Sequence, residues 1–271
     1  MFEKLETRMN LRFNLLATVG AAASIVWAAP SHATIMYSTP DAVVSEDFDG
    51  AAQSAATLSW VDDSSVPNWF AYQTATDAAP SDYRVTSGES TAAELYLWRE
   101  NASATDFAFG TKPNTSSGDM MFGFAVTNDT GQTLTEFSLG YTGEQWAASG
   151  SGNNNQLVVG YQLGSIANLG VSGWTTIDDL TFNSPQDVID DGTLDGNDAA
   201  NREVFGLQTI TGLDWLDGQE LWIRWFDANS SGVDQGLGVD DVVFSAAVPE
   251  PASLMLVALG GAAILLPRRR A

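Results

Sequence analysis

The chain has no cysteine, only one histidine and few basic side chains. Without cysteine it can form neither disulfides nor thiolate metal sites. The histidine, His32, lies in the leader segment described below, so the domain that follows has none. Serine–histidine and cysteine–histidine triads, histidine-ligated zinc sites and thiol redox centres are therefore excluded for this domain. Chemistry based on carboxylates or hard cations remains open.

Positive charge is scarce, since 11 Lys and Arg residues face 34 Asp and Glu residues, giving a net charge of −23. Such a field repels nucleic-acid phosphates and anionic lipid headgroups, and it concentrates cations. We therefore expect no nucleic-acid partner, and calcium becomes a candidate structural ion. Between the two ends of the chain the basic residues are Arg84, Arg99, Lys112, Arg202 and Arg224.

The N-terminal segment has the layout of a secretory signal. Arg12 precedes an apolar stretch over residues 15–29, and small residues lead to a cleavage site after Ala33. This order predicts that residues 1–33 are a signal peptide removed by signal peptidase and the export machinery. Met9 is an alternative start, because the preceding residues are charged and lie outside this layout. The alternatives are a short N-terminal anchor or a buried helix, but spanning a bilayer takes roughly 20 apolar residues, more than this stretch supplies.

The C-terminal segment, residues 249–271, combines three features in a fixed order. They are the triplet Pro249, Glu250 and Pro251, the apolar segment 252–266, and the cluster Arg268, Arg269 and Arg270. The prolines favour an extended approach, and the apolar segment can insert as a short transmembrane helix that the arginines then anchor. Terminal arginines hold the far end of such a helix in the cytoplasm, so the preceding domain faces outward.

This tail resembles the PEP-CTERM sorting signal of exported bacterial proteins, which exosortase processes. The resemblance implies export, transient anchoring in the inner membrane, cleavage near the triplet, and release to the cell surface or an exopolysaccharide matrix. It implies no catalytic activity. A permanent single-pass anchor is the alternative for the same residues.

Between the ends, short stretches of alternating apolar and polar residues predict strands separated by turn-rich segments. The predicted strands cover residues 43–48, 83–86, 95–98, 120–126, 134–141, 157–163, 174–182, 204–210, 221–226 and 239–244. No long amphipathic helix interrupts them. We predict an all-β fold, an antiparallel two-sheet β-sandwich of the jelly-roll type over residues 34–248, flanked by the signal helix and the C-terminal hydrophobic helix. Two smaller domains are the alternative. The run Tyr141–Trp146 resembles a segment of other secreted jelly-roll domains that carry this tail.

Tryptophan is frequent, with nine residues in the chain. Strand alternation over residues 221–226 places Trp222 and Trp225 on opposite faces. One face must line the core, so at most one of the two can present a surface for sugar stacking. Trp222 is our candidate carbohydrate-binding residue, and core packing is the alternative for it.

Oxygen-bearing side chains at alternate positions, Asp227, Asn229 and Ser231, precede a glycine, as in the first half of a calcium-binding loop. The helices and the twelfth-position glutamate of an EF-hand are missing, so that motif is rejected. Further candidate metal ligands are Asp234, Asp240, Asp241, Asp47 and Asp49. Asp47 and Asp49 can approach Asp240 or Asp241 only if the first and last strands pair. An acidic turn that caps its own backbone is the alternative.

Paired carboxylates also serve glycosidases, and Glu144 beside Trp146 is the best single candidate for such an acid. No glycosidase signature surrounds it. The sequence therefore favours a noncatalytic surface or matrix protein, with exopolysaccharide as a partner and no enzyme activity. A carbohydrate-binding module is the first alternative, and a calcium-dependent glycosidase is the second.

Overall fold

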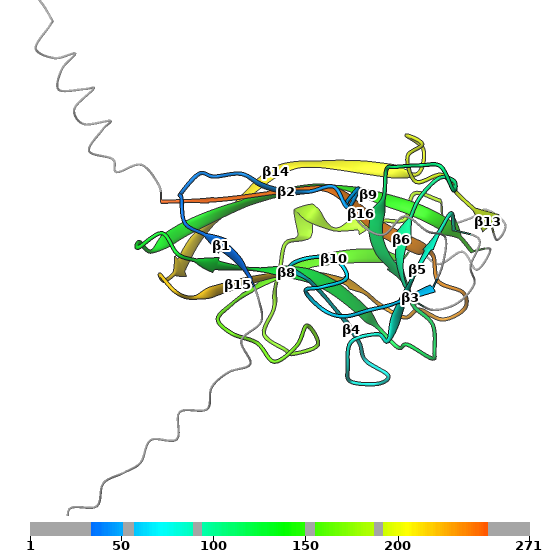
Figure 1. Ribbon diagram of the computed structural model, residues 1–271, viewed down its shortest axis with the longest axis horizontal. Helices are drawn as coiled ribbons and strands as arrows, with labels where there is room; N and C mark the ends of the chain where they lie inside the picture. Colours follow the sequence, from blue (N-terminus) through cyan, green and yellow to red (C-terminus); the bar gives the residue numbers. More distant parts are fainter. Residues whose placement is uncertain (1–33, 51–56, 89–93, 150–154, 187–191, 249–271) are drawn as a thin grey trace, which may run out of the picture.

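The computed structural model describes residues 34–50, 57–88, 94–149, 155–186 and 192–248. These residues form two β-sheets that lie one above the other (Figure 1). The helical content of this part is one 3₁₀ turn, Asp178–Leu180. The predicted all-β, two-sheet fold is therefore confirmed. The two predicted terminal helices lie outside the described residues.

Sheet 1 has seven strands. They are β1 (Ile35–Tyr37), β4 (Trp69–Gln73), β8 (Met120–Asn128), β10 (Gln156–Leu163), β11 (Thr175–Thr176), β12 (Phe182–Asn183) and β15 (Glu220–Asp227). The hydrogen-bonded order is β1-β8-β15-β10-β11, with β4 also paired to β8 and β12 to β10. Strand β15 thus lies at the centre of the sheet.

Sheet 2 has nine strands. They are β2 (Val44–Glu46), β3 (Thr57–Ser59), β5 (Asp82–Thr86), β6 (Glu94–Trp98), β7 (Ala108–Lys112), β9 (Leu134–Ala148), β13 (Gly192–Thr193), β14 (Arg202–Trp215) and β16 (Gly236–Ala247). Their order is β13-β9-β16-β7-β6-β5-β3, with β14 paired to β9 and β2 to β16. The pairing of an early strand with the last one, on which the Asp47 and Asp49 hypothesis depended, is therefore present.

The structure corrects two details of the prediction. The sheets are mixed instead of purely antiparallel, because β1 runs parallel to β8 and β5 runs parallel to β6. The predicted strand over residues 174–182 is broken into β11, the 3₁₀ turn and β12. The turn contains Asp178 and Asp179, which are poor strand formers and favour turn conformations.

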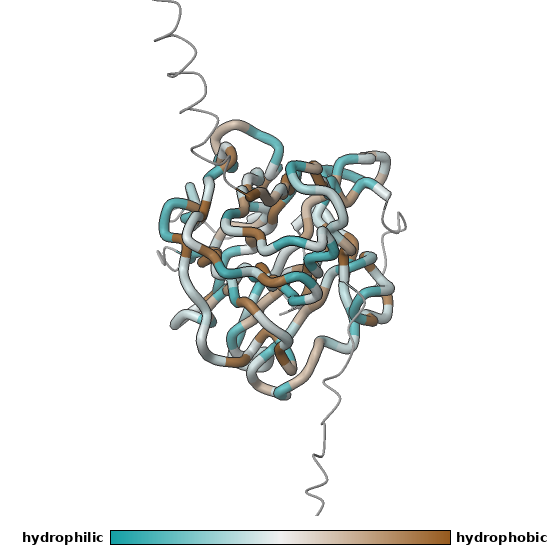
Figure 2. The backbone as a smooth tube through the Cα atoms, turned by 90° about the vertical axis from the view of Figure 1, so that its left-hand side faces the viewer, coloured by the Kyte–Doolittle hydropathy of each residue, from teal (hydrophilic) through white to brown (hydrophobic). Residues whose placement is uncertain are grey.

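The core between the sheets is built largely from aromatic rings. Trp225 stacks on Trp69 and Phe122, with ring centroids 5.6 and 5.8 Å apart, and Phe109 packs edge-on against Phe122 at 5.3 Å. Hydrophobic and hydrophilic residues are interspersed along the backbone (Figure 2), and along β15 successive side chains divide between the core and the outer face of sheet 1. Phe48, which follows β2, is buried here and packs on Trp69 and Phe109.

Candidate carbohydrate site on the outer face of sheet 1

Successive side chains of strand β15 point alternately into the core and to the outer face of sheet 1. Leu221, Ile223 and Trp225 belong to the core between the sheets, while Trp222 packs in a separate cluster on the outer face. The alternation predicted for this strand is confirmed. Any site that includes Trp222 therefore lies on the outer face of sheet 1.

The segment between β10 and β11, residues 164–174, crosses this outer face. Its Ile166 and Leu169 are buried in the same cluster as Trp222. Gly170 lies against the ring of Tyr72, since a Cβ at this position would be 2.3 Å from Tyr72 Cε1. Only glycine permits that approach, and the segment consequently forms a wall beside strand β4.

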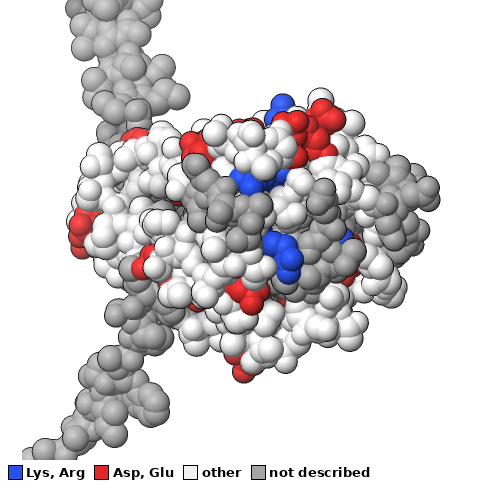
Figure 3. Space-filling view, turned by 45° about the vertical axis from the view of Figure 1, so that its right-hand side comes forward, with Lys and Arg blue, Asp and Glu red and all other residues white. Residues whose placement is uncertain are grey.

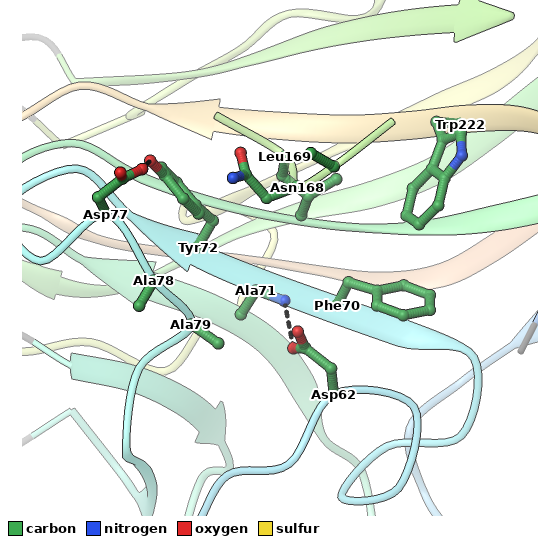
Figure 4. A pocket seen from close by; sticks show the side chains of 11 residues that line it. Asp62, Phe70, Ala71, Tyr72, Asp77, Ala78, Ala79, Asn168, Leu169 and Trp222 are labelled. Carbon is green, nitrogen blue, oxygen red and sulfur yellow. Dashed lines mark hydrogen bonds between the residues drawn. The ribbon is translucent and has the colours of Figure 1, made fainter. Parts of the chain in front are cut away.

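A pocket of about 230 Å³ lies between this wall and strand β4 (Figure 4). Its apolar lining includes the rings of Phe70, Tyr72 and Trp222, together with Leu169 and alanine residues. In Figure 4 Tyr72 and Asp77 lie at one end, and Phe70 and Trp222 lie at the other. Aromatic walls with a few polar groups are the usual lining of small-molecule sites.

Three polar side chains line this pocket: Asp62, Asp77 and Asn168. Asp62 accepts hydrogen bonds from the Ala71 N–H at 3.0 Å and from Trp60 Nε1 at 2.7 Å. Asp77 accepts a hydrogen bond from the Tyr72 hydroxyl. Asn168 Oδ1 accepts from the Gly170 N–H at 2.9 Å, which directs its amide group by an Asx turn. Carboxylate acceptors and an amide donor are suited to sugar hydroxyls.

Trp222 itself forms a wall of the pocket. Its side chain is 1% exposed, packs on Phe70 with ring centroids 5.0 Å apart, and donates from Nε1 to Glu220 Oε2 at 2.8 Å. A ring covered in this way cannot offer an open stacking face. The candidate residue therefore lies at the candidate site, and Tyr72 and Asn168, which the sequence did not single out, lie there with it.

A second pocket of about 260 Å³ lies on the same face, also beside the 164–174 wall. It is lined by Trp174, Arg224, Phe226 and residues of β10 and β11. Arg224 lies 4.3 Å from the Trp174 ring centroid, and its Nη1 donates to the Leu169 carbonyl at 2.5 Å. Sequence reasoning missed both residues. The one signal for Arg224 was the scarcity of basic side chains, of which the domain has five; nothing singled out Trp174 from the other tryptophans.

The residues proposed for calcium lie at one end of β15 and in the loop after it. Asp227 is fully buried and accepts from Thr111 Oγ1 at 2.7 Å, whereas Ser231 is exposed. Asn229 uses its backbone N–H to bond Asp119 Oδ1 at 3.0 Å. Burial, opposed in part by the Thr111 hydrogen bond and reinforced by nearby Asp234 and Asp119, holds the Asp227 pKa well above its usual range.

Asp234 does join this loop, because it accepts from Asn155 Nδ2 at 2.8 Å and from the Ser230 N–H at 3.1 Å. Asp240 and Asp241 lie elsewhere, on β16, and Asp47 and Asp49 follow the neighbouring strand β2. Among the residues that the structure describes, no three acidic side chains are placed to hold a metal ion. Calcium binding stays a prediction.

Glu144, the candidate acid, lies on β9 with its side chain 1% exposed. Its Oε2 accepts from Trp146 Nε1 at 2.9 Å, and its Oε1 is buried with no partner among the described residues. Burial raises its pKa to about 7, against the smaller lowering effect of the Trp146 bond. Glu144 pairs with Gly238 on β16, and Asp240 lies two residues further along that strand. The two carboxyls therefore share one face of sheet 2. Both are covered, which leaves no described surface where a glycan could reach Glu144.

The sorting residues Pro249–Pro251 and Arg268–Arg270, like the signal peptide, lie outside the described residues. Within the described part of the chain, no helix has the length and hydropathy of a membrane span.

No family model matches the chain, and no curated protein matches it. Among solved structures, it is similar to the enzymatically active domain of bacteriophage CBA120 tailspike protein 4, with 12% identity over 66% of this chain and 19% of that one, at a TM-score of 0.34. The chain thus spans about a fifth of the length of that domain.

Two carbohydrate-binding modules are also similar. TmCBM61, solved with β-1,4-galactotriose, has 9% identity over 59% of this chain and 86% of that one, at a TM-score of 0.29. A cellulose-specific module, CBM28, has 13% identity over 79% of this chain and 99% of that one, at a TM-score of 0.33. These scores are too low for any of the three to decide the function, which has to be inferred from the site.

Proposed function

We propose that this protein is an exported, noncatalytic carbohydrate-binding protein of the cell surface or exopolysaccharide matrix. The pocket between strand β4 and the 164–174 wall carries the proposal. It joins an apolar lining, to which the buried rings of Phe70, Tyr72 and Trp222 contribute, to carboxylate and amide groups suited to sugar hydroxyls. The burial of Glu144 and Asp240 supports a role without catalysis.

Asn168 offers the sharpest test of glycan binding. In the described part of the chain its Oδ1 bonds the Gly170 N–H, and its Nδ2 is left to donate to a ligand. Asn168→Asp keeps the oxygen that holds the turn and removes the donor. We expect roughly three- to tenfold weaker affinity for any glycan that the parent binds on an array, as the loss of one hydrogen bond implies.

Asn101→Asp is the matched control. Asn101 Oδ1 bonds the Ser103 N–H at 2.8 Å, so it holds the same kind of turn, but it lies between β6 and β7 of sheet 2. That variant adds the same charge and should leave affinity unchanged. Equal effects of the two substitutions would place the binding site elsewhere, and release of reducing sugar by the parent would contradict a noncatalytic role.

The mass of the secreted protein tests whether both ends are removed during export. Because both ends carry ordered signals, we expect protein secreted by a host that makes exosortase to begin near Thr34 and to lack the arginine cluster of residues 268–270. Intact-mass spectrometry of the secreted protein measures both ends at once. Recovery of the full-length chain from the cytoplasm would contradict the proposal, and a mature chain that keeps the arginines would indicate a permanent anchor.

A further inference from the structure

Arg224 has an unusual setting for a cation in this protein. It lies in the middle of β15 and points to the outer face of sheet 1, opposite Gly123 on β8 and Gly160 on β10. The two glycines place no side chain beside it in its own row of the sheet. Above and below it the face is aromatic, since the guanidinium lies 4.3 Å from the Trp174 ring centroid and 5.5 Å from that of Phe226.

This guanidinium has no carboxylate partner within the described residues, although the chain has 34 acidic residues. Its one hydrogen bond there goes from Nη1 to the Leu169 carbonyl. Burial lowers its pKa to about 10, so it stays charged at neutral pH, and no nearby acid opposes that effect. A half-buried cation without a counter-ion attracts an anion more strongly than an exposed one does.

The groups around Arg224 indicate which class of anion the pocket would bind. A planar guanidinium recognises carboxylate and sulfate groups with paired hydrogen bonds, and an indole ring beside it offers a surface for a sugar. The pocket of about 260 Å³ formed by Trp174, Arg224 and Phe226 combines the two. Arg224 and Trp222 are two residues, about 7 Å, apart on one face of β15, so the two pockets are lined by neighbouring positions of the same strand.

We propose that the pocket formed by Trp174, Arg224 and Phe226 is an anion subsite for an acidic sugar, a uronic acid or a sulfated residue, of the glycan that enters the first pocket. The inference rests on the proposed function and names the glycan class. It predicts that the protein prefers an acidic glycan over its uncharged counterpart in spite of a net charge of −23.

The net negative charge of the protein makes the effect of removing Arg224 easy to recognise. Acidic side chains are spread over the face seen in Figure 3, with a few basic ones between them. Without Arg224 the remaining field repels an anionic glycan, so the preference should reverse and not merely disappear.

The probes are matched pairs: oligogalacturonate against its methyl ester, and a sulfated galactan against the unsulfated chain. The parent should bind one acidic member about tenfold more tightly than its partner, as a charge-assisted hydrogen bond implies. Which pair shows the effect tells carboxylate from sulfate.

Arg224→Gln should reverse this preference and bind the uncharged member of the pair more tightly than the acidic one. Arg224→Lys, which keeps the charge but not the planar fork, should retain part of the preference for the acidic member. Arg202→Gln is the control, since it removes one positive charge from an exposed position on sheet 2. Thermal melts of all variants show whether each is folded, and affinity for the uncharged member reports whether the Leu169 wall has kept its place.

The outcomes separate the two proposals. If the parent binds uncharged and acidic glycans equally, or Arg202→Gln changes the preference as much as Arg224→Gln does, the subsite is overturned and glycan binding stands. If the parent binds no glycan in either pair or on a broad array, the proposed function and the subsite fall together.

Discussion

The protein is expected to become less stable as the pH rises from about 4 to 9, by at least roughly 3 kcal/mol. Buried carboxyls cause this: Glu144 and Asp240, together with Asp227, whose pKa burial also raises. Burial raises the pKa of Glu144 from 4.5 to about 7, and burial raises the pKa of Asp240 from 3.8 to about 9. One pKa unit corresponds to about 1.4 kcal/mol, so Glu144 alone accounts for roughly 3 kcal/mol.

The sign follows from proton binding. At pH 4 to 9 the folded protein holds protons on these carboxyls that the unfolded chain has begun to release, so raising the pH favours unfolding. The stabilising contribution is complete below the unfolded pKa and is lost as the pH passes the folded pKa of each group. Urea unfolding at pH 5, 7 and 9 measures the slope.

The neighbourhood explains why the charged forms are disfavoured. Besides each other, the two carboxyls face Asp241 on β16 and Asp106 before β7, which raise their pKa values, and Arg202 at the start of β14 lowers that of Glu144. The backbone N–H of Asp241 donates to Asp240 Oδ1 at 2.6 Å, which opposes the effect of burial on Asp240. Burial is the largest cause for both groups, so substitution of a buried carboxyl should have a larger effect than removal of an exposed one.

Asp240→Asn and Asp241→Asn form a matched pair that tests this. Each removes one negative charge, and asparagine tolerates the left-handed backbone of Asp241, whose φ is 50°. In Asp240→Asn the new amide keeps an oxygen that can accept the Asp241 N–H but cannot ionise, so this variant should flatten the pH dependence and raise stability at pH 9. Asp241 is exposed, and its substitution should change little. Equal slopes in the two variants would mean that general charge repulsion, and not burial, sets the pH dependence.

Sequence patterns were most informative where the physics is local. Alternation along residues 221–226 correctly predicted that Trp222 and Trp225 lie on opposite faces, because side chains of a strand point to opposite faces whatever lies around them. The predicted strand over residues 120–126 lies within β8, and that over 134–141 lies within β9. By contrast, the parallel pairing of β1 with β8 depends on residues about 90 positions apart, and no local pattern reveals it.

The site depends on such distant contacts even more. Tyr72, Asn168 and Arg224 meet because the 164–174 segment folds back over sheet 1, held by the contact of Gly170 with Tyr72 and by the Arg224 bond to Leu169. In the sequence these residues have no common pattern. The sequence made Glu144 a candidate acid beside Trp146, yet Gly196 from a distant loop lies against the Trp146 ring and helps to bury the pair.

Trp225 lies in the core and Phe226 lines the second pocket, so substitution of the two residues should affect stability to different extents. Trp225 is buried, and its ring centroid lies between 5.4 and 6.2 Å from those of four other rings: Trp69, Phe122, Phe124 and Tyr141. Its removal leaves a cavity that this close-packed set cannot fill, so Trp225→Ala should lower the free energy of unfolding by about 3–5 kcal/mol. Phe226, the next residue, lies half-buried on the outer face and lines the second pocket.

Phe226→Ala is therefore expected to lower stability by about 1 kcal/mol, within the ordinary range for a partly exposed position, and to weaken binding of the acidic glycan. Urea unfolding of the two variants at one pH gives the comparison directly, and the glycan pairs described above give the second readout. A difference between the variants of less than about 1 kcal/mol would mean that Trp225 does not anchor the core. Loss of stability without loss of acidic-glycan affinity in Phe226→Ala would remove that ring from the subsite and leave Trp174 as its aromatic wall.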